Sequence, residues 1–445
     1  MGLATFKGGV HPYEGKELSE NKPVQVLMPK GDLVFPMSQG IGAPANPLVK
    51  KGDRVLAGQI IGEAGGFISA NVICSVSGTV KAVEPRRVAS GGMVNSVVVE
   101  NDGQYEAVEG MGKDRDPATL SKQEIRDIVK AAGIVGMGGA GFPTNVKLSP
   151  KNEDAIEYIL INGAECEPYL TSDYRCMMED PEKIIGGLKV VLQLFDKAKG
   201  VIGIENNKPE AIKKLKELVK DEPRIEVCEL LTKYPQGGER SLIYAVTGRS
   251  VNSSMLPADA GCIVDNIGTV IAIYDAVCKT TPLIERVFTV TGDAIADPRN
   301  FRIKIGTNTQ ELIEAAGGFK SEPEKVISGG PMMGFAMFDL DVPVIKTNGS
   351  VLCMTKDQVA ASVETPCIRC GKCVSACPSH IVPVMMMKAA LKGDCDTFEK
   401  LNGMECMECG SCTFVCPAKR PLTQAFKEMR KTVAANRRKK AQGGK

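Results

Sequence analysis

The sequence predicts a multidomain protein that combines β and α/β domains with a helical metal-binding domain. Short β-type runs broken by glycine and proline fill residues 26–115, strands alternate with helices over 116–258, and two four-cysteine runs lie near the C-terminus. At 445 residues the chain is too long for a single hydrophobic core. We therefore expect several domains, preceded by an arm at 1–25 and followed by a basic tail at 433–445.

Residues 26–115 are expected to form a β-rich domain of small hairpins. The stretches VKKGDRVLAGQIIGEA and VICSVSGTVKAVEPRRV place turn residues between short apolar runs. This pattern resembles the barrel-sandwich fold of biotinyl and lipoyl carrier domains. Carrier domains present a modifiable lysine at a hairpin tip, whereas the equivalent stretch here, GGFISANVICSVSG, has none. The domain is therefore predicted to be a structural module.

Residues 116–258 alternate between helical and strand patterns. SKQEIRDIVKAAG begins with a capping box at Ser121 and Glu124 and ends at Gly133. IEYILINGA (156–164) is typical of a buried strand, and helices and strands continue to alternate as far as residue 248. Such alternation favours βαβ units around a parallel sheet, a Rossmann-like domain.

Residues 259–348 change character again. VFTVTGD and FRIKIGT indicate strands, TQELIEAAGG a helix, and KVISGGPMMG a further strand and turn. This order predicts a small β-grasp-like (SLBB-type) domain.

Residues 349–432 then carry the cysteine runs. Beyond Ala418 the chain is basic, with Glu428 as its only acid. We expect a frayed helix end or a solvated tail there, and docking on an acidic partner or an anionic lipid face is the alternative.

Composition argues against several classes of function. A net charge of +2 gives no strong steering towards nucleic acid. The best candidate for a membrane span, residues 267–278, includes Asp275 and is much shorter than the ~20 apolar residues that a span needs. MGLATFKGGVHPYEG lacks the apolar core of a signal peptide. We therefore expect no membrane span. In a chain without a secretion signal, the sixteen cysteines are expected to serve metal binding, catalysis or burial rather than disulfides.

The two cysteine runs, CIRCGKCVSACP (367–378) and CMECGSCTFVCP (406–417), follow the C-x₂-C-x₂-C-x₃-C-P pattern of ferredoxins with two [4Fe–4S] clusters. In that pattern the fourth cysteine of each run binds the other cluster. Structural zinc is the alternative, but zinc sites take four ligands in two CxxC pairs. We expect the first cluster at Cys367, Cys370, Cys373 and Cys416, and the second at Cys406, Cys409, Cys412 and Cys377.

The other eight cysteines are scattered along the chain. Isolated cysteines in a reducing environment are mostly small buried hydrophobes, and we expect that of Cys74, Cys166, Cys176, Cys228, Cys262, Cys278, Cys353 and Cys395.

Four polar segments in the middle of the chain suggest a ligand site. GIVGMGGAGFPTNVK (133–147) is glycine-dense but does not follow a first strand, as a dinucleotide fingerprint would, so a flexible loop is the alternative. NGAECEP (162–168) stands at the carboxyl end of a buried strand, where α/β folds bind ligands. YPQGGERS (234–241) and DNIGT (265–269) add further glycines and polar groups. The candidate binding residues are Gly136, Gly138, Gly139, Gly141, Lys147, Asn162, Glu165, Glu167, Tyr234, Gly237, Gly238, Glu239, Asn266 and Thr269.

The segments GxGGAGFPxxxK, NxxExEP and YxxGxE, in this order, resemble the flavin- and NADH-binding subunit of respiratory Complex I. The β-rich domain before them and the ferredoxin block after them are similar to the C subunit of the Rnf electron transport complex, an ion-translocating ferredoxin:NAD⁺ oxidoreductase. VHPYEGK and SGGPMMG also resemble that protein, and the likeness covers nearly the whole chain. Met137 and Ala164 depart from the Complex I pattern, which has arginine and aspartate there.

The resemblance implies that FMN is bound by the 136–141 loop, with Lys147 and Asn162 reaching the flavin or its phosphate. NAD(H) would stack on the flavin with Glu165, Glu167 and Glu239 near its ribose or carboxamide. No side chain would act as a catalytic acid or base, because the hydride passes from cofactor to cofactor. FMN would then link this two-electron transfer to the single electrons of the clusters.

The resemblance also implies a peripheral subunit on the cytoplasmic face of the cell membrane. It would be attached through the membrane and iron–sulfur subunits of the complex, which pass electrons from ferredoxin. Two alternatives are a soluble cobalamin reductase of a microcompartment and a flavin-free iron–sulfur adaptor. Membrane co-purification, reduction of cob(III)alamin and NADH-dependent bleaching distinguish the three.

Overall fold

A four-stranded parallel sheet forms the centre of the α/β region. The computed structural model describes residues 2–443, and within it the strands β9 (Tyr158–Gly163), β10 (Lys199–Glu205), β11 (Ile225–Leu230) and β12 (Cys262–Asn266) lie in the order β11-β10-β9-β12. The chain therefore moves outward from β9 through β10 to β11 and then returns to the other side of β9. This reversal creates a switch point between β9 and β12, and ligands of open α/β sheets bind at such points.

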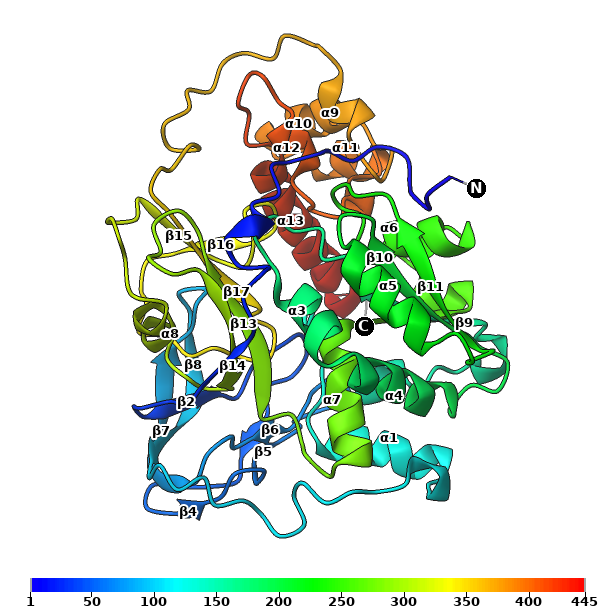
Figure 1. The fold of residues 1–445 in the computed structure, drawn as a ribbon. Coiled ribbons are helices and arrows are strands. Elements are labelled where there is room, and N and C mark those ends of the chain that lie inside the picture. Colours follow the sequence, from blue (N-terminus) through cyan, green and yellow to red (C-terminus); the bar gives the residue numbers. More distant parts are fainter. Residues whose placement is uncertain (1, 444–445) are drawn as a thin grey trace.

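Helices cover both faces of this sheet (Figure 1). The larger core joins the sheet to α1, α4, α5 and α7, and a smaller core joins its other face to α6. The predicted capping box is present, because Ser121 and Glu124 exchange hydrogen bonds at the start of α1. The helices of this region are α1 (Lys122–Ala131), α2 (Thr144–Lys147), α3 (Ser172–Glu179), α4 (Pro181–Leu192), α5 (Pro209–Leu218), α6 (Glu239–Thr247) and α7 (Ile267–Cys278).

The most apolar stretch of the sequence forms helix α7. It packs along α4, where a Cβ added at Gly187 would lie 2.1 Å from the carbonyl oxygen of Val270. Nine of its residues are buried, so its hydrophobicity serves the protein core. No helix among residues 2–443 is both long and apolar enough to span a bilayer.

The α/β region extends past its predicted end at residue 258. β12 pairs with β9 and leads directly into α7, so residues 262–278 belong to this region and not to the SLBB-type domain. The prediction was wrong here because the turns and the short helix η4 (Pro257–Ala260) ahead of β12 have the composition of a linker. The pairing partner of β12 lies about a hundred residues earlier in the chain, where local sequence gives no signal.

The β-rich region consists of two small sheets around one core. One sheet has the order β2-β8-β7-β4 and the other β3-β5-β6. Leu33, Phe35, Ile61 and Val97 are buried between them, which is the predicted barrel-sandwich arrangement. The strands are β2 (Leu33–Pro36), β3 (Asn46–Pro47), β4 (Arg54–Val55), β5 (Ile60–Glu63), β6 (Val72–Ile73), β7 (Gly78–Arg87) and β8 (Met93–Asn101).

A six-stranded mixed sheet with helix α8 (Thr309–Ala315) forms the SLBB-type region. Its strands are β1 (Gln25–Leu27), β13 (Glu285–Thr291), β14 (Arg299–Lys304), β15 (Lys325–Ser328), β16 (Phe335–Met337) and β17 (Ser350–Met354). The predicted boundaries assigned β1 to the barrel-sandwich domain and β17 to the ferredoxin domain, and both assignments were wrong. β1 pairs with β14, and β17 pairs with β13 and β15. Most of these partners lie far away in the chain, so the sequence around β1 and β17 does not show which sheet they join.

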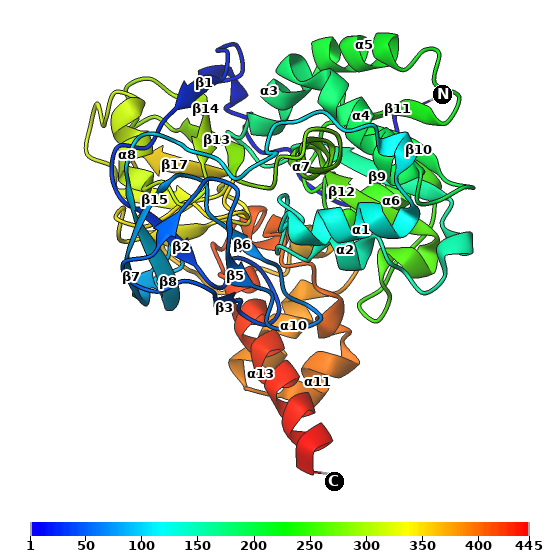
Figure 2. The same ribbon diagram turned by 90° about the horizontal axis from the view of Figure 1, so that it is seen from below.

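The ferredoxin region is helical, and helix α13 (Leu422–Gly443) projects from it away from the rest of the molecule (Figure 2). The predicted basic tail is thus the end of a long helix as far as Gly443. Arg430 and Arg437 on this helix form ion pairs with Glu408 and Glu399. The shorter helices are α9 (Lys372–Ser375), α10 (Pro383–Leu391), α11 (Cys395–Lys400) and α12 (Ser411–Phe414). Short 3₁₀ helices complete the chain at η1 (Lys16–Leu18), η2 (Pro117–Thr119), η3 (Glu153–Ala155) and η5 (Gly403–Glu405).

The close contact between α4 and α7 yields a test of the fold. Gly187→Ala should lower the free energy of unfolding by about 1–3 kcal/mol, because the new methyl group overlaps the backbone of α7. Chemical denaturation followed by circular dichroism measures this change. Gly92→Ala is the matched control, since its Cβ would meet nothing nearer than 3.8 Å. Equal stability of the two variants would contradict the packing.

Candidate functional site

Two asparagines mark the carboxyl edge of the sheet at the switch point. Asn162 lies in β9 and Asn266 ends β12, and the two residues are register partners. The Asn162 amide donates to the carbonyl of Gly237 at 2.8 Å, and the Asn266 amide donates to the carboxylate of Asp173 at 2.7 Å. The predicted segments NGAECEP, YPQGGERS and DNIGT therefore meet at one place.

The glycine-rich loop folds over this edge. It is closed at its base by a hydrogen bond from the Gly136 N–H to the Phe142 carbonyl, 2.9 Å. The backbone N–H of Met137 donates to the hydroxyl of Thr269 at 3.0 Å, which fixes the loop to the start of α7. A Cβ at Gly138 would lie 2.9 Å from the Cβ of Asn266, whereas one at Gly139 would meet nothing within 4 Å. The loop thus approaches β12 closely on one side and leaves open space on the other.

The barrel-sandwich region supports the far end of this loop. Gly141 has a φ of +73°, and a Cβ there would lie 2.8 Å from the backbone of Gly40. The N–H of Ile41 donates to the carbonyl of Ala140 at 2.9 Å. A Cβ at Gly141 would also lie 2.7 Å from the side chain of Thr347, in the segment before β17. Three regions of the chain therefore enclose the glycine-rich segment, which is built into the fold and is not a free connecting loop.

Lys147 reaches the same edge from helix α2. Its ammonium group donates to the carbonyl of Val264 at 2.7 Å and to the carboxylate of Asp265 at 2.8 Å. Asp265 is buried, and its second oxygen, Oδ2, has no hydrogen-bond partner among the described residues. A buried acceptor without a partner costs free energy, so this oxygen fits an N–H or O–H donor of a bound ligand. Asp265 begins the DNIGT segment but was not among the predicted binding residues.

Glu239 lies in the first turn of α6, close enough to Lys147 and Asp265 for their charges to influence its carboxyl. Its side chain is accessible, yet the surrounding protein raises the pKa of its carboxyl by desolvation, and the positive charge of Lys147 opposes this. The carboxyl is therefore exposed and lies within the influence of the Lys147 charge.

The two acids of NxxExEP bind protein backbone. The Glu165 carboxylate accepts the N–H groups of Asp173 at 2.7 Å and Tyr174 at 3.2 Å, at the start of α3. The Glu167 carboxylate accepts the N–H groups of Met332 at 3.2 Å and Met333 at 2.7 Å, in the SGGPMMG segment. Burial raises the pKa of both acids to about 7. Both side chains thus hold the loop of residues 164–171, between β9 and α3, in shape. The resemblance had instead implied that they face a nucleotide.

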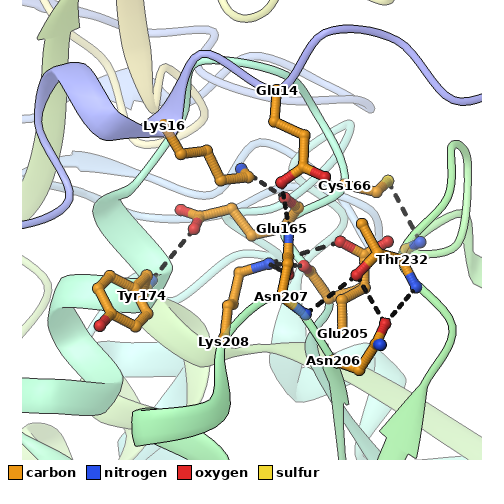
Figure 3. A network of polar contacts seen from close by, with 12 residues as sticks. Glu14, Lys16, Glu165, Cys166, Tyr174, Glu205, Asn206, Asn207, Lys208 and Thr232 are labelled. Atoms are coloured by element: carbon orange, nitrogen blue, oxygen red, sulfur yellow. Dashed lines mark hydrogen bonds and ion pairs between the residues drawn. The ribbon is translucent and has the colours of Figure 1, made fainter.

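A buried network of charges lies beneath that loop (Figure 3). The Lys208 ammonium donates to the Ala164 carbonyl at 2.7 Å and lies 3.4 Å from the Glu205 carboxylate. On the other side, the Lys16 ammonium donates to the Glu165 carbonyl at 2.8 Å. None of these three lysine and glutamate residues was among the predicted binding residues, although Lys16 lies in VHPYEGK, one of the segments that carry the resemblance.

The Tyr234–Gly238 segment joins this site to the ferredoxin region. Tyr234 is buried, and its hydroxyl donates to the carbonyl of Cys409 at 2.7 Å. A Cβ at Gly238 would lie 2.9 Å from the side chain of Met407, and Gly237 lies against Asn162. The second cysteine run therefore packs directly on a segment that also touches the sheet edge.

The two cysteine runs share one backbone conformation. The φ angles of Arg369 and Gly371 are 58° and 76°, and those of Glu408 and Gly410 are 56° and 80°. These left-handed residues curl each loop so that a backbone N–H lies 3.4 Å from a cysteine sulfur, from Arg369 to Cys367 and from Glu408 to the equivalent cysteine of the second run. N–H groups directed at sulfur are typical of iron–sulfur loops.

Cysteines of the two runs pack in one core. Burial is the main cause that raises the pKa of Cys412 to about 12, and the nearby thiols of Cys406, Cys409 and Cys377 add to it. Burial likewise raises the pKa of Cys373, with the thiol of Cys416 as a further cause. No three His, Cys, Asp or Glu side chains within residues 2–443 are placed to hold a single metal ion. The thiol of Cys377 is therefore close enough to influence Cys412 of the second run, and the thiol of Cys416 close enough to influence Cys373 of the first.

The remaining cysteines behave largely as expected. Five of the eight are buried, namely Cys74, Cys176, Cys262, Cys278 and Cys353, and three are partly buried, namely Cys166, Cys228 and Cys395.

Four family models match the chain and agree with these regions. They are the RnfC barrel sandwich hybrid domain at residues 4–104, the Nuo51 FMN-binding domain at 129–275, the SLBB domain at 287–336 and the 4Fe-4S dicluster domain at 366–419. The fold and the matched domains together define an electron-transfer protein that binds FMN and two iron–sulfur clusters. They confirm the predicted fold class and cofactors.

Curated relatives identify the family. The chain is 46% identical over 99% of its length to the C subunit of the proton-translocating ferredoxin:NAD⁺ oxidoreductase complex of Clostridium ljungdahlii, covering 96% of that protein. It is also 46% identical to the C subunit of the Na⁺-translocating complex of Acetobacterium woodii, over 98% of each chain. The chain therefore belongs to the RnfC family, the C subunits of ion-translocating ferredoxin:NAD⁺ oxidoreductases, which confirms the resemblance.

Solved structures agree at the level of the fold. The NAD⁺-reducing [NiFe]-hydrogenase in its H₂-reduced state matches with a TM-score of 0.51 and 19% identity, over 71% of this chain and 61% of that chain. An NAD⁺-reducing [NiFe]-hydrogenase in the air-oxidised state gives a TM-score of 0.51 and 16% identity, over 73% and 69% of the two chains.

The separation of the cysteines into two sets is testable. Cys370→Ser should remove about half of the iron and leave flavin binding intact, because only one cubane loses a ligand. Iron and FMN determination on anaerobically purified protein measures both. Cys395→Ser is the control and should keep all of the iron, since this cysteine lies outside both runs. Loss of all the iron together with the flavin would contradict separate sites.

Proposed function

We propose that this chain is the FMN-, NAD(H)- and iron–sulfur-binding subunit of a membrane-bound, ion-translocating ferredoxin:NAD⁺ oxidoreductase. When bound, FMN exchanges a hydride with a nicotinamide and single electrons with iron–sulfur clusters. The protein's part is to hold these groups next to one another. Relatives of equal identity are named for protons and for Na⁺, so membership of the family is compatible with either ion.

The switch point is the proposed FMN site. The glycine loop can supply backbone N–H groups from Gly138, Gly139 and Gly141, and such groups favour phosphate. Gly136 closes the loop instead, because its N–H donates to the Phe142 carbonyl. Lys147 adds a positive charge, while Asn162, Asn266 and Thr269 fix the floor. Two observations support the fit: the open space beside Gly139 and the unpartnered Oδ2 of buried Asp265.

NAD(H) is proposed to enter beside Glu239, whose accessible carboxylate can accept hydrogen bonds from ribose hydroxyls. Gly237 and Gly238 let the backbone approach this point closely. Glu165 and Glu167 contribute by holding the loop above the sheet edge, because their oxygens accept backbone N–H groups.

One observation carries the proposal: the buried Tyr234 hydroxyl donates to the Cys409 carbonyl. A single segment thereby touches the nucleotide site and the second cysteine run. We assign Cys406, Cys409, Cys412 and Cys377 to this second cluster, and Cys367, Cys370, Cys373 and Cys416 to the first. Cys367 and Cys370 are exposed, so the first cluster lies on the solvent side. Electrons would therefore pass between a partner and the flavin through the first cluster and then the second.

The proposed partners are the other subunits of the complex. The relatives are subunits of complexes, so we propose that this chain is attached peripherally, on the cytoplasmic face of the membrane, by the membrane and iron–sulfur subunits of an Rnf complex. These would relay electrons from ferredoxin to NAD⁺. A microcompartment cobalamin reductase would instead be recovered without membranes, and fractionation of cells therefore separates the two proposals.

The direct experiment is anaerobic purification followed by titration with NADH. We expect about one FMN and about eight iron atoms per chain, from two cubanes, and bleaching of both flavin and cluster absorbance by NADH. Protein that holds zinc in the cysteine runs, or that does not respond to NADH, would overturn the proposal.

Glu239 gives a more local test. Glu239→Gln should raise the NADH concentration for half-maximal flavin reduction about tenfold, because a charge-assisted hydrogen bond is weakened, and should leave FMN retention nearly unchanged. Stopped-flow absorbance and equilibrium dialysis measure the two. Glu182→Gln, an exposed acid in the first turn of α4, is the matched control. Equal losses of FMN and NADH binding would argue against this role for Glu239.

A further inference from the structure

Within the N-terminal arm, residues 4–19 run between the α/β region and the ferredoxin helices (Figure 1). At its start it extends the parallel sheet beyond β11, because the N–H of Ala4 donates to the Glu229 carbonyl at 3.1 Å and the N–H of Leu231 donates back to Ala4 at 2.9 Å. The arm is thus fixed to the α/β region before it reaches the cysteine runs.

Two glycines carry the arm through a narrow gap. The Gly9 N–H donates to the Ala376 carbonyl at 2.9 Å, and a Cβ at Gly8 would lie 2.8 Å from the carbonyl oxygen of Cys377. The next residue, Val10, exchanges two backbone hydrogen bonds of 2.8 Å with Tyr234. With φ angles of +86° and +83°, Gly8 and Gly9 also adopt a conformation that favours glycine. The arm therefore fills the space between Cys377 and the Tyr234 segment.

The end of the arm holds the NxxExEP loop. Lys16 is 5% exposed, and its ammonium donates to the carbonyl oxygen of Glu165 at 2.8 Å (Figure 3). It also donates to the carbonyl oxygens of Glu167 at 3.1 Å and Leu170 at 2.7 Å. These three bonds use all the donors of an ammonium group. Ser19 continues the contact through its hydroxyl, which lies 2.7 Å from that of Thr171.

We propose that this arm is a positioning element of the electron-transfer site. One continuous segment touches a cysteine assigned to the second cluster at one end and the loop over the nucleotide site at the other. It thereby sets the separation of the cluster from the flavin, and Lys16 sets the shape of the loop. This inference rests on the proposed function, because it assumes that the cluster and the flavin exchange electrons.

Gly8→Ala tests the cluster end. The added methyl group must displace the Cys377 backbone, and a small misplacement of a reacting group costs up to about a hundredfold in rate. We expect flavin reduction by NADH to keep its rate, the following cluster reduction to slow at least about tenfold, and the electron paramagnetic resonance (EPR) signal of the second cluster to change. Gly112→Ala is the matched control, because Gly112 has a φ of +83° and a Cβ there meets nothing within 4 Å.

Lys16→Ala tests the end of the arm that holds the NxxExEP loop. It is also the second measurement if the Gly8→Ala protein loses its iron. The variant leaves three carbonyls without their donor, so we expect the NADH concentration for half-maximal flavin reduction to rise about tenfold while the EPR signals stay unchanged. Added propylammonium should restore much of the affinity, because it fits the space that the lysine side chain leaves. Lys22→Ala removes an exposed ion pair with Asp297 from the neighbouring part of the chain and is the control.

Two results would overturn the inference in protein that contains FMN and is reduced by NADH. One is a Gly8→Ala variant that matches Gly112→Ala in cluster reduction and EPR. The other is a Lys16→Ala variant that matches Lys22→Ala or is not rescued by propylammonium. Wild-type protein without FMN, or without NADH-dependent reduction, would instead contradict the proposed function.

Discussion

The hydrogen bond from the Tyr234 hydroxyl to the Cys409 carbonyl is the contact on which the arrangement of the two redox regions depends. A hydroxyl buried without an acceptor costs free energy, so this bond favours the docked position of the second cysteine run. The same segment reaches the sheet edge three residues later, where Gly237 accepts a hydrogen bond from Asn162. A chain that links hydride transfer to single-electron transfer needs this proximity, because its two kinds of cofactor occupy different regions.

The other regions hold this junction in place from the outside. The barrel-sandwich region supports the glycine loop through Ile41, and the SLBB-type region reaches Glu167 through the backbone of Met332. The N-terminal arm fills the space that remains beside Cys377. Each region therefore contributes backbone around the switch point, where the strand order of the parallel sheet reverses between β9 and β12. Regions far apart in the sequence thus meet around the proposed site.

Local signals in the sequence predicted much of this structure. The capping box at Ser121 and the two cysteine runs depend on residues close together in the chain, and both have the expected form. Features that depend on distant residues could not be predicted: the pairing of β12 with β9, the three carbonyls around Lys16, and the buried Asp265. Glu165 shows the same limit, because a strand-end acid has the same local pattern whether it binds a ligand or backbone N–H groups.

The central claim is that the second cluster lies between the flavin and the first cluster. Rapid freeze-quench EPR after mixing with NADH tests it most directly, with Cys412→Ser as the variant that lacks an intact second cluster. The account predicts that the signal of the second cluster appears first in the wild-type protein, and that the first cluster of Cys412→Ser stays oxidised on that timescale. Earlier reduction of the first cluster, or its normal reduction in the variant, would contradict the account.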